Sequence, residues 1–158
     1  MNVIQQIRNE LSAEWIPSIY ADKIRPLRTR SFKLEIPERE NDPVIQATLL
    51  GTELMVGRRR IACPDINTAR YLSIFATLGC QNVAVPYDIT QIGALADNLE
   101  DSLRLIVARL DRDRSQLSPQ MYGRLRASLF RTMRNEIAQI GAGEMMPLFN
   151  RSTKQREN

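Results

Sequence analysis

Two aspartates are the side chains in this sequence best placed to hold a ligand. Asp65 follows an expected strand that ends at Cys63, and Asp88 follows another that ends near Val85. If the two strands are parallel neighbours, their carboxyl ends share one sheet edge beside helix N-termini, where ligands commonly bind. Two nearby carboxylates could hold Mg²⁺ or share a proton. The expected ligand edge consists of Asp65, Asn67, Tyr87 and Asp88.

Helix capping is the simpler role for both aspartates. An aspartate just before a helix commonly accepts a hydrogen bond from a backbone N–H of the first turn. Asp88 with Gln91 also has the spacing of a capping box. The glycines show neither the dinucleotide-fold nor the phosphate-loop spacing. We therefore expect two caps, and we predict no catalytic residue, no metal site and no cofactor.

Composition removes several other kinds of chemistry. The 158 residues include no histidine, which excludes Ser-His, Cys-His and His-metal sites. The two cysteines, Cys63 and Cys80, are too few for a disulfide framework or a zinc site. Cys63 would lie beside a helix N-terminus, which can lower a thiol pKa, but we expect both cysteines to be core residues. No signal peptide or membrane-length apolar run is visible, so we expect a cytoplasmic protein.

Arginine carries most of the positive charge. The net charge is +4, and the sequence contains 19 arginines and three lysines. Basic residues cluster in 23–33, 58–60 and 104–134. Because the guanidinium is a rigid fork of donors, it suits carboxylates and phosphates. On an expected helix over 119–140, a rotation of ~100° per residue places Arg124, Arg131 and Arg134 on one face, apart from the apolar stripe.

The arginine clusters are consistent with phosphate contacts to nucleic acid. Stacking aromatics are scarce on the helix, where only Tyr122 and Phe130 occur, and no helix-turn-helix, zinc finger or ribonucleoprotein signature is present. The candidate residues for binding nucleic acid or a partner are Arg58, Arg59, Arg60, Arg124, Arg131 and Arg134.

Ion pairing is the alternative role for the same arginines. Acidic side chains on the expected helix 89–112, namely Asp97, Glu100 and Asp101, are available for it, as are those of a partner subunit. We favour this structural or interface role of the arginines over nucleic-acid binding.

Hydrophobic periodicity predicts a helix, three strands, a helix, a strand and two long helices. The expected elements are a helix over 2–13, an irregular segment 14–30, strands over 31–36, 44–50, 53–63 and 82–85, and helices over 66–78, 89–112 and 119–140. A tight connection is expected at Gly51-Thr52, a break at Gly57 and a helix stop at Gly79. Strand 53–63, helix 66–78 and strand 82–85 predict a parallel pair with a right-handed crossover. The expected fold is therefore α+β: one domain over 1–150, with a small mixed sheet packed by two long C-terminal helices, followed by a disordered polar tail over 151–158.

The element order over residues 1–86 resembles the core of the restriction-endonuclease-like nucleases. The resemblance implies an acid on the second core strand and a Glu/Asp-x-Lys triad on the third. Here the third strand offers Glu53-Leu54-Met55 and then Arg58-Arg59-Arg60, without a lysine, and Asp42 only precedes the second strand. The metal-dependent cleavage of that family is therefore not carried over to any residue of this chain.

Three functions remain, in order of preference. The first is a non-catalytic interaction or regulatory protein that forms a homo-oligomer through its long helices and arginine face. The second is a nucleic-acid-binding protein, and the third is a metal-assisted enzyme on a phosphate ester with Asp65 and Asp88 as ligands. A protein partner is expected and a membrane is not. The apolar segment 145–149 is expected to fold back onto the domain, with a docking strip as its alternative.

Overall fold

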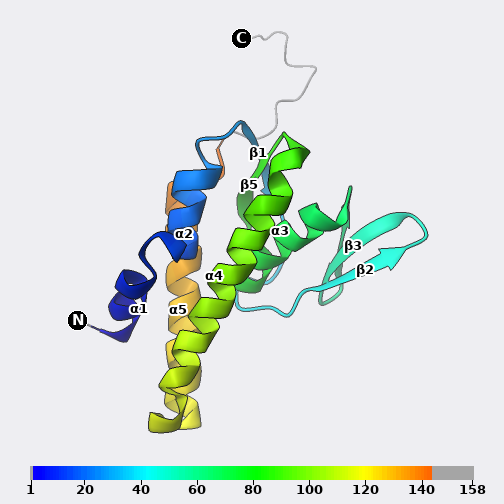
Figure 1. Ribbon diagram of the computed structural model, residues 1–158. Helices are drawn as coiled ribbons and strands as arrows, with labels where there is room; N and C mark the ends of the chain where they lie inside the picture. The colour runs from blue at the N-terminus through cyan, green and yellow to red at the C-terminus, as the bar shows by residue number, and fades with distance from the viewer. Residues whose placement is uncertain (1, 144–158) are drawn as a thin grey trace.

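The computed structural model describes residues 2–143, in which helices pack with a two-stranded sheet and a three-stranded sheet lies at one side (Figure 1). The helices are α1 (Val3–Leu11), α2 (Ile16–Ile19), α3 (Ile66–Leu78), α4 (Ile92–Arg112) and α5 (Pro119–Ile140). Strands β1 (Thr29–Lys33) and β5 (Asn82–Pro86) form one sheet, and β2 (Val44–Thr48), β3 (Gly51–Val56) and β4 (Arg59–Cys63) form the other. The α+β class expected from the sequence is confirmed. Residue 1 and residues 144–158, with the predicted apolar strip and polar tail, lie outside the described part.

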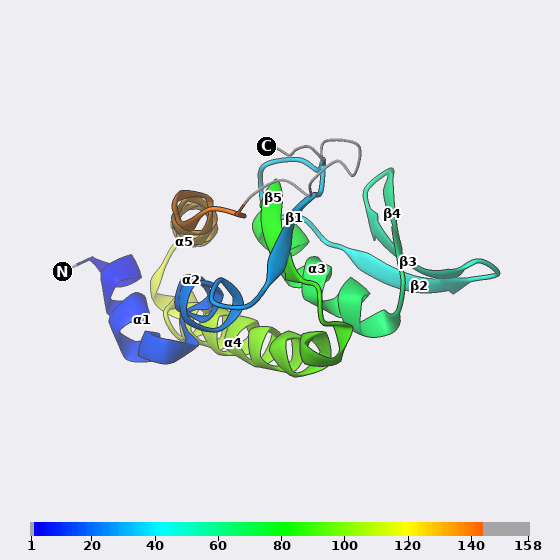
Figure 2. The same cartoon turned by 90° about the horizontal axis from the view of Figure 1, so that it is seen from above.

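One buried cluster joins the helices to both sheets. Its largest side chains include Trp15, Tyr20, Tyr71, Phe75 and Phe130. The rings of Tyr20 and Tyr71 pack against Phe75 with centroid distances of 5.6 Å and 5.2 Å. Helix α3 contacts α4 on one side and β2 and β3 on another, which places it at the centre of the molecule (Figure 2). The apolar faces of α4 and α5 pack against this cluster.

The N-terminal segment is more helical than its sequence suggests. Residues 14–30 were expected to be irregular, but α2 continues directly into a π-helical turn over Tyr20–Ile24. Pro17 is compatible with this helix because it occupies the first turn, where its missing N–H has no helical partner. Ile16, Ile19 and Ile24 are fully buried, so tertiary packing stabilises a segment of low helical propensity.

The predicted parallel pairing of β4 with β5 is wrong. Strand β5 pairs antiparallel with β1, and β4 pairs antiparallel with β3 in the other sheet. At the second edge of β5, side chains bond the backbone groups of Ala84 instead. The Tyr71 hydroxyl donates to the Ala84 carbonyl, and the Ala84 N–H donates to the Tyr20 hydroxyl over 2.9 Å. These two tyrosines occupy the place that a parallel neighbour would take. The single sheet that the nuclease-like element order implied is therefore not formed.

Strands β2 and β3 form a hairpin that projects from the body of the molecule (Figure 1). Its turn lies at Leu49-Leu50, two residues before the connection predicted at Gly51-Thr52. The Thr48 hydroxyl stabilises this turn, because it accepts from the Leu50 N–H over 3.2 Å and donates to the Gly51 carbonyl over 3.1 Å. The break predicted at Gly57 is confirmed, and it separates β3 from β4.

The boundaries of the long helices follow local signals. Helix α3 ends at Gly79 with a φ of 85°, as predicted, and α5 begins after the cap Ser118 with Pro119 in its first turn. Helix α4 begins three residues later than expected, because a 3-10 turn occupies Ile89–Gln91. Asp88 caps this turn through the Thr90 N–H rather than through Gln91.

Candidate interaction surfaces

The three arginines predicted to share a face of α5 have different surroundings. Arg124 and Arg131 are exposed and have no polar partner within residues 2–143. Arg134 is half-buried, and its Nη1 donates to the Leu78 carbonyl at the end of α3 over 2.8 Å. A cation at this position complements the negative end of the helix dipole. Arg134 therefore has a structural contact that its two neighbours lack.

The arginines of the β3–β4 turn are also divided. Arg59 donates to the Leu34 carbonyl over 3.0 Å and pairs with Glu35 at 3.4 Å. Arg60 pairs with Glu53 at 3.5 Å across the two strands. Arg58 alone is exposed without such a contact in the described chain. The turn therefore presents one unpaired cation rather than three.

Ion pairs engage five further arginines of the described chain, Arg8, Arg70, Arg104, Arg109 and Arg126, with partners different from those expected. Arg70 of α3 holds both Asp97 and Glu100 of α4, and these hydrogen bonds raise the pKa of its guanidinium. Arg126 of α5 binds the Glu40 carboxylate through Nε at 2.9 Å and Nη2 at 2.7 Å. Of the carboxylates expected to pair with α5, Asp97 and Glu100 therefore pair with α3, and Asp101 pairs with Arg104 of α4 itself.

The expected ligand edge consists of helix caps and packing contacts. Asp65 Oδ1 accepts from the Thr68 N–H over 2.7 Å, and Asp88 Oδ1 accepts from the Thr90 N–H over 3.0 Å. The bonds to Thr90 also lower the pKa of Asp88. Asn67 accepts from Arg70 over 2.9 Å. Both carboxylates therefore cap helical turns, and the strands that precede them lie in different sheets.

The fourth residue of that edge, Tyr87, belongs to a different surface. The Arg28 guanidinium lies over its ring at 5.0 Å from the centroid, and Arg30 lies over Phe32 at 5.6 Å. Both arginines belong to the basic segment, which we define as residues 23–33. None of its five cations pairs with a carboxylate of the described chain. The basic segment is therefore the main concentration of uncompensated positive charge found in residues 2–143.

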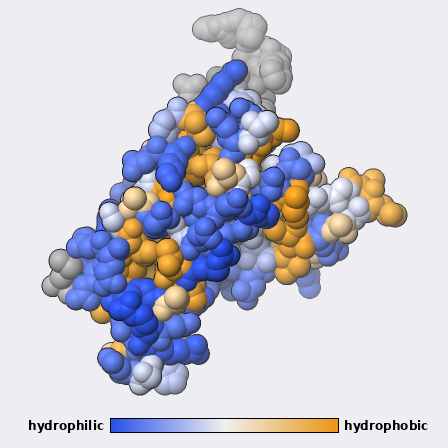
Figure 3. Space-filling view, in the orientation of Figure 1, coloured by the Kyte–Doolittle hydropathy of each residue, from blue (hydrophilic) through white to orange (hydrophobic). Residues whose placement is uncertain are grey.

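The largest apolar exposure is at the hairpin tip, which we define as Leu49 and Leu50. Their exposed fractions are 105% and 101%, so neither side chain contacts the body of the molecule. Figure 3 shows the tip as an isolated hydrophobic projection. Turn positions usually carry glycine, proline, asparagine or aspartate, and the Thr48 and Gly51 contacts do not require leucine between them. This surface could not be recognised from the sequence pattern, because the two leucines extend the apolar pattern of the preceding strand.

A shallow apolar groove lies between two helices. The α3/α4 groove has a volume of about 720 Å³ and is lined by Ile74, Glu100, Leu103, Arg104, Val107, Ala108 and Asp111. Its lining combines four apolar side chains with three charged ones of both signs. The groove is concave and apolar, whereas the hairpin tip is convex and apolar.

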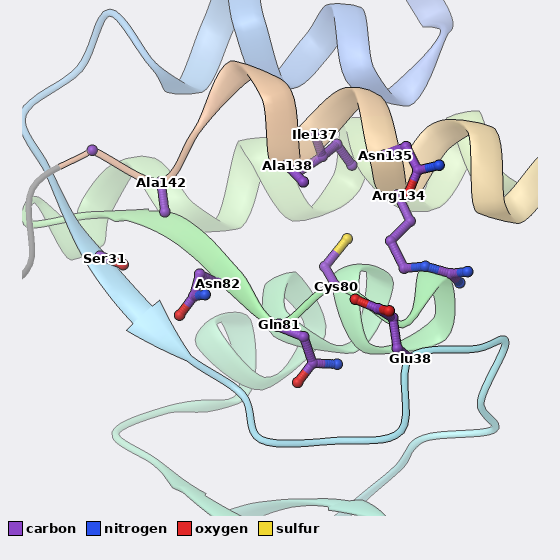
Figure 4. A pocket seen from close by; sticks show the side chains of 11 residues that line it. Ser31, Glu38, Cys80, Gln81, Asn82, Arg134, Asn135, Ile137, Ala138 and Ala142 are labelled. Carbon is purple, nitrogen blue, oxygen red and sulfur yellow. The ribbon is translucent and has the colours of Figure 1, made fainter.

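A polar cavity lies beside α5 (Figure 4). It has a volume of about 430 Å³, and its walls come from α5 and the residues after it, the middle of β1, the start of β5, and the loops before β2 and β5. Cys80 faces this cavity, and its side chain is only 3% exposed. Burial raises the pKa of the Cys80 thiol to about 12 and also raises the pKa of the Cys63 thiol.

We expect both cysteines to be nearly inert in the folded protein. A pH of 8 lies below the raised pKa of each thiol, so both cysteines are protonated. The reactive nucleophile is the thiolate, not the thiol. Iodoacetamide labelling followed by mass spectrometry should proceed at least ~100-fold more slowly in native buffer than in urea. Rapid labelling of the folded chain at Cys80 would show that the thiol is accessible and contradict its assigned burial.

Comparison with known proteins provides no further identification, since no family model, curated protein or solved structure matches this chain. Within residues 2–143, no helix is long and apolar enough to cross a membrane. The same part of the chain contains no group of three or more side chains suited to hold a metal ion.

Proposed function

We propose that this protein is a non-catalytic binding module that self-associates, with the hairpin tip of one copy docked in the α3/α4 groove of a second copy. The observation that carries the proposal is the complete exposure of Leu49 and Leu50 on a projecting hairpin. Exposed apolar projections of this kind are typical of interaction sites. The hairpin carries no charged side chain from Val44 to Thr52, so docking its tip would bury no unpaired charge of this segment.

A second copy is the favoured occupant because one chain carries both halves of the contact. The tip supplies two leucine side chains, and the groove supplies a mainly apolar lining that includes Val107 and Ala108. A twofold arrangement makes the contact twice. Burying four leucines contributes about 6–12 kcal/mol, and association costs about 4–15 kcal/mol. We therefore expect a reversible dimer with a dissociation constant of roughly micromolar or weaker.

Docking in the groove is tested by placing a charge in the groove lining. Ala108→Glu puts a carboxylate where the tip would dock, and sedimentation equilibrium should then detect monomer where the wild-type chain forms dimer. Ala94→Glu is the matched control, because it makes the same change at an exposed position of α4 outside the groove. A wild-type chain that stays monomeric at ~0.1 mM, or an Ala108→Glu chain that dimerises normally, would reject the proposal.

Nucleic-acid binding is a second candidate function, supported by the basic segment. Arg28 and Arg30 stack on aromatic rings, which leaves their guanidinium edges available to phosphate oxygens. Tyr87 is 39% exposed, so part of its ring surface is open to a base. Residues of this segment are therefore better candidates for phosphate contact than the arginines of α5.

Single-stranded nucleic acid should bind weakly and with a steep salt dependence if this candidate holds. We expect the double change Arg28→Ala/Arg30→Ala to lower the affinity for labelled oligonucleotides at least ~10-fold, because phosphate contacts dominate such binding. Arg124→Ala/Arg131→Ala is the control with the same loss of charge. Equal losses in both variants would indicate a diffuse charge effect and exclude a site at the basic segment.

A further inference from the structure

Two opposite charges line the polar cavity without pairing with each other. Glu38 comes from the loop before β2 and Arg134 comes from α5, and no ion pair joins them in the described chain. Figure 4 shows both charged groups at the same end of the cavity, beside Cys80. A carboxylate and a guanidinium held in one cavity, each able to accept a partner, form a site for a ligand with both charges.

Arg134 retains most of its binding capacity. A guanidinium has five N–H donors, and the contact with the Leu78 carbonyl uses only Nη1. Glu38 has no hydrogen bond or ion pair within residues 2–143. The structural role of Arg134 at the end of α3 therefore fixes its position while leaving donors for a carboxylate.

Neutral polar groups complete the cavity. Ser31 of β1, Asn82 of β5 and Asn135 of α5 line it, and none of these side chains has a partner in the described part of the chain (Figure 4). Gln81 differs, since its amide already bonds the Ile36 and Gly79 carbonyls. Three uncommitted hydroxyl or amide groups on separate elements suit a small ligand with several polar atoms.

We propose that this cavity binds a free α-amino acid with a neutral polar side chain. Arg134 receives the carboxylate, Glu38 receives the ammonium group, and the amide and hydroxyl groups receive the side chain. The volume of about 430 Å³ lies toward the lower end of the range for small-molecule sites, which fits a ligand of this size. This site is separate from the hairpin tip and the α3/α4 groove, so it does not depend on self-association.

Calorimetric titration of the whole chain with L-glutamine tests the site. We expect saturable binding, weakened at least ~10-fold for glutaramate, which lacks the ammonium, and for 4-aminobutanamide, which lacks the carboxylate. Glu38→Gln should weaken L-glutamine binding by a similar factor, whereas Asp42→Asn, in the same loop but outside the cavity, should not.

Arg134→Gln is the second variant, with Arg131→Gln as its control one turn away on α5. Because Arg134 also contacts Leu78, circular dichroism must show an intact fold for that variant, and Asn82→Ala serves if it does not. Absence of L-glutamine binding at ~10 mM, or equal binding by Glu38→Gln and wild type, would overturn the proposal.

Discussion

Changing both leucines of the hairpin tip to serine is expected to weaken self-association at least ~100-fold without unfolding the protein. Each dimer would lose four buried leucines, and one buried leucine contributes about 1.5–3 kcal/mol. Since ~1.4 kcal/mol is a factor of ten in the dissociation constant, even partial burial yields this change. Sedimentation equilibrium over a concentration series measures the constant directly. The melting temperature should stay close to wild type, because neither side chain contacts the monomer.

Met121→Ser provides the control for this change. Met121 is 56% exposed near the start of α5, and it neither belongs to the tip nor lines the groove. Its replacement removes a large exposed apolar side chain but should leave the dissociation constant unchanged. If Met121→Ser and the double tip variant weaken association equally, nonspecific hydrophobic contact would explain the dimer and the tip would lose its assigned role.

Gly79→Ala should lower the free energy of unfolding more than a glycine-to-alanine change at a glycine with open space around it. Gly79 ends α3 with a φ of 85°, and a Cβ there would lie 2.3 Å from the Arg39 carbonyl oxygen. The left-handed conformation costs a residue with a Cβ about 1–2 kcal/mol, and forced displacement of packed groups costs about 1–3 kcal/mol. We expect the free energy of unfolding in urea to fall by about 2–5 kcal/mol.

Gly57→Ala separates the backbone term from the steric term. Gly57 also has a positive φ, of 60°, but a Cβ there would meet nothing within 4 Å. Its substitution should therefore cost only the conformational term, about 1–2 kcal/mol. Equal losses at Gly57 and Gly79 would mean that the loop around Arg39 yields easily and that the close packing at the end of α3 is unimportant.

Helix limits were predictable from the sequence, whereas strand pairing was not. Gly79, Ser118 and Gly141 act on the backbone beside them, so α3 and α5 could be bounded from local residues alone. The partner of β5 depends on Tyr20, which lies 64 residues away in the sequence and fills the strand edge through its hydroxyl. Such a long-range contact leaves no periodic signal, and a parallel neighbour was therefore expected in its place.

Among the candidate surfaces too, local contacts were predictable from the sequence and long-range contacts were not. Capping by Asp65 is a contact within three residues, and it could be expected from position alone. The role of each arginine could not, because Arg70 reaches carboxylates about 30 residues away on α4 while Arg124 reaches none in the described chain. The hairpin tip was hidden by its own composition, since Leu-Leu resembles the end of a strand. The flanking Thr48 and Gly51 were the available sign of a turn.

Disulfide trapping between two copies tests the docking of the hairpin tip in the groove most directly. One tagged chain carries Leu50→Cys and a second, differently tagged chain carries Val107→Cys. The native Cys63 and Cys80 are buried and do not compete. Mild oxidation of the mixture should yield a covalent heterodimer in preference to either homodimer, because the tip of one copy lies in the groove of the other. Cross-linking no faster than for a mixture in which Ala94→Cys replaces Val107→Cys would contradict the account.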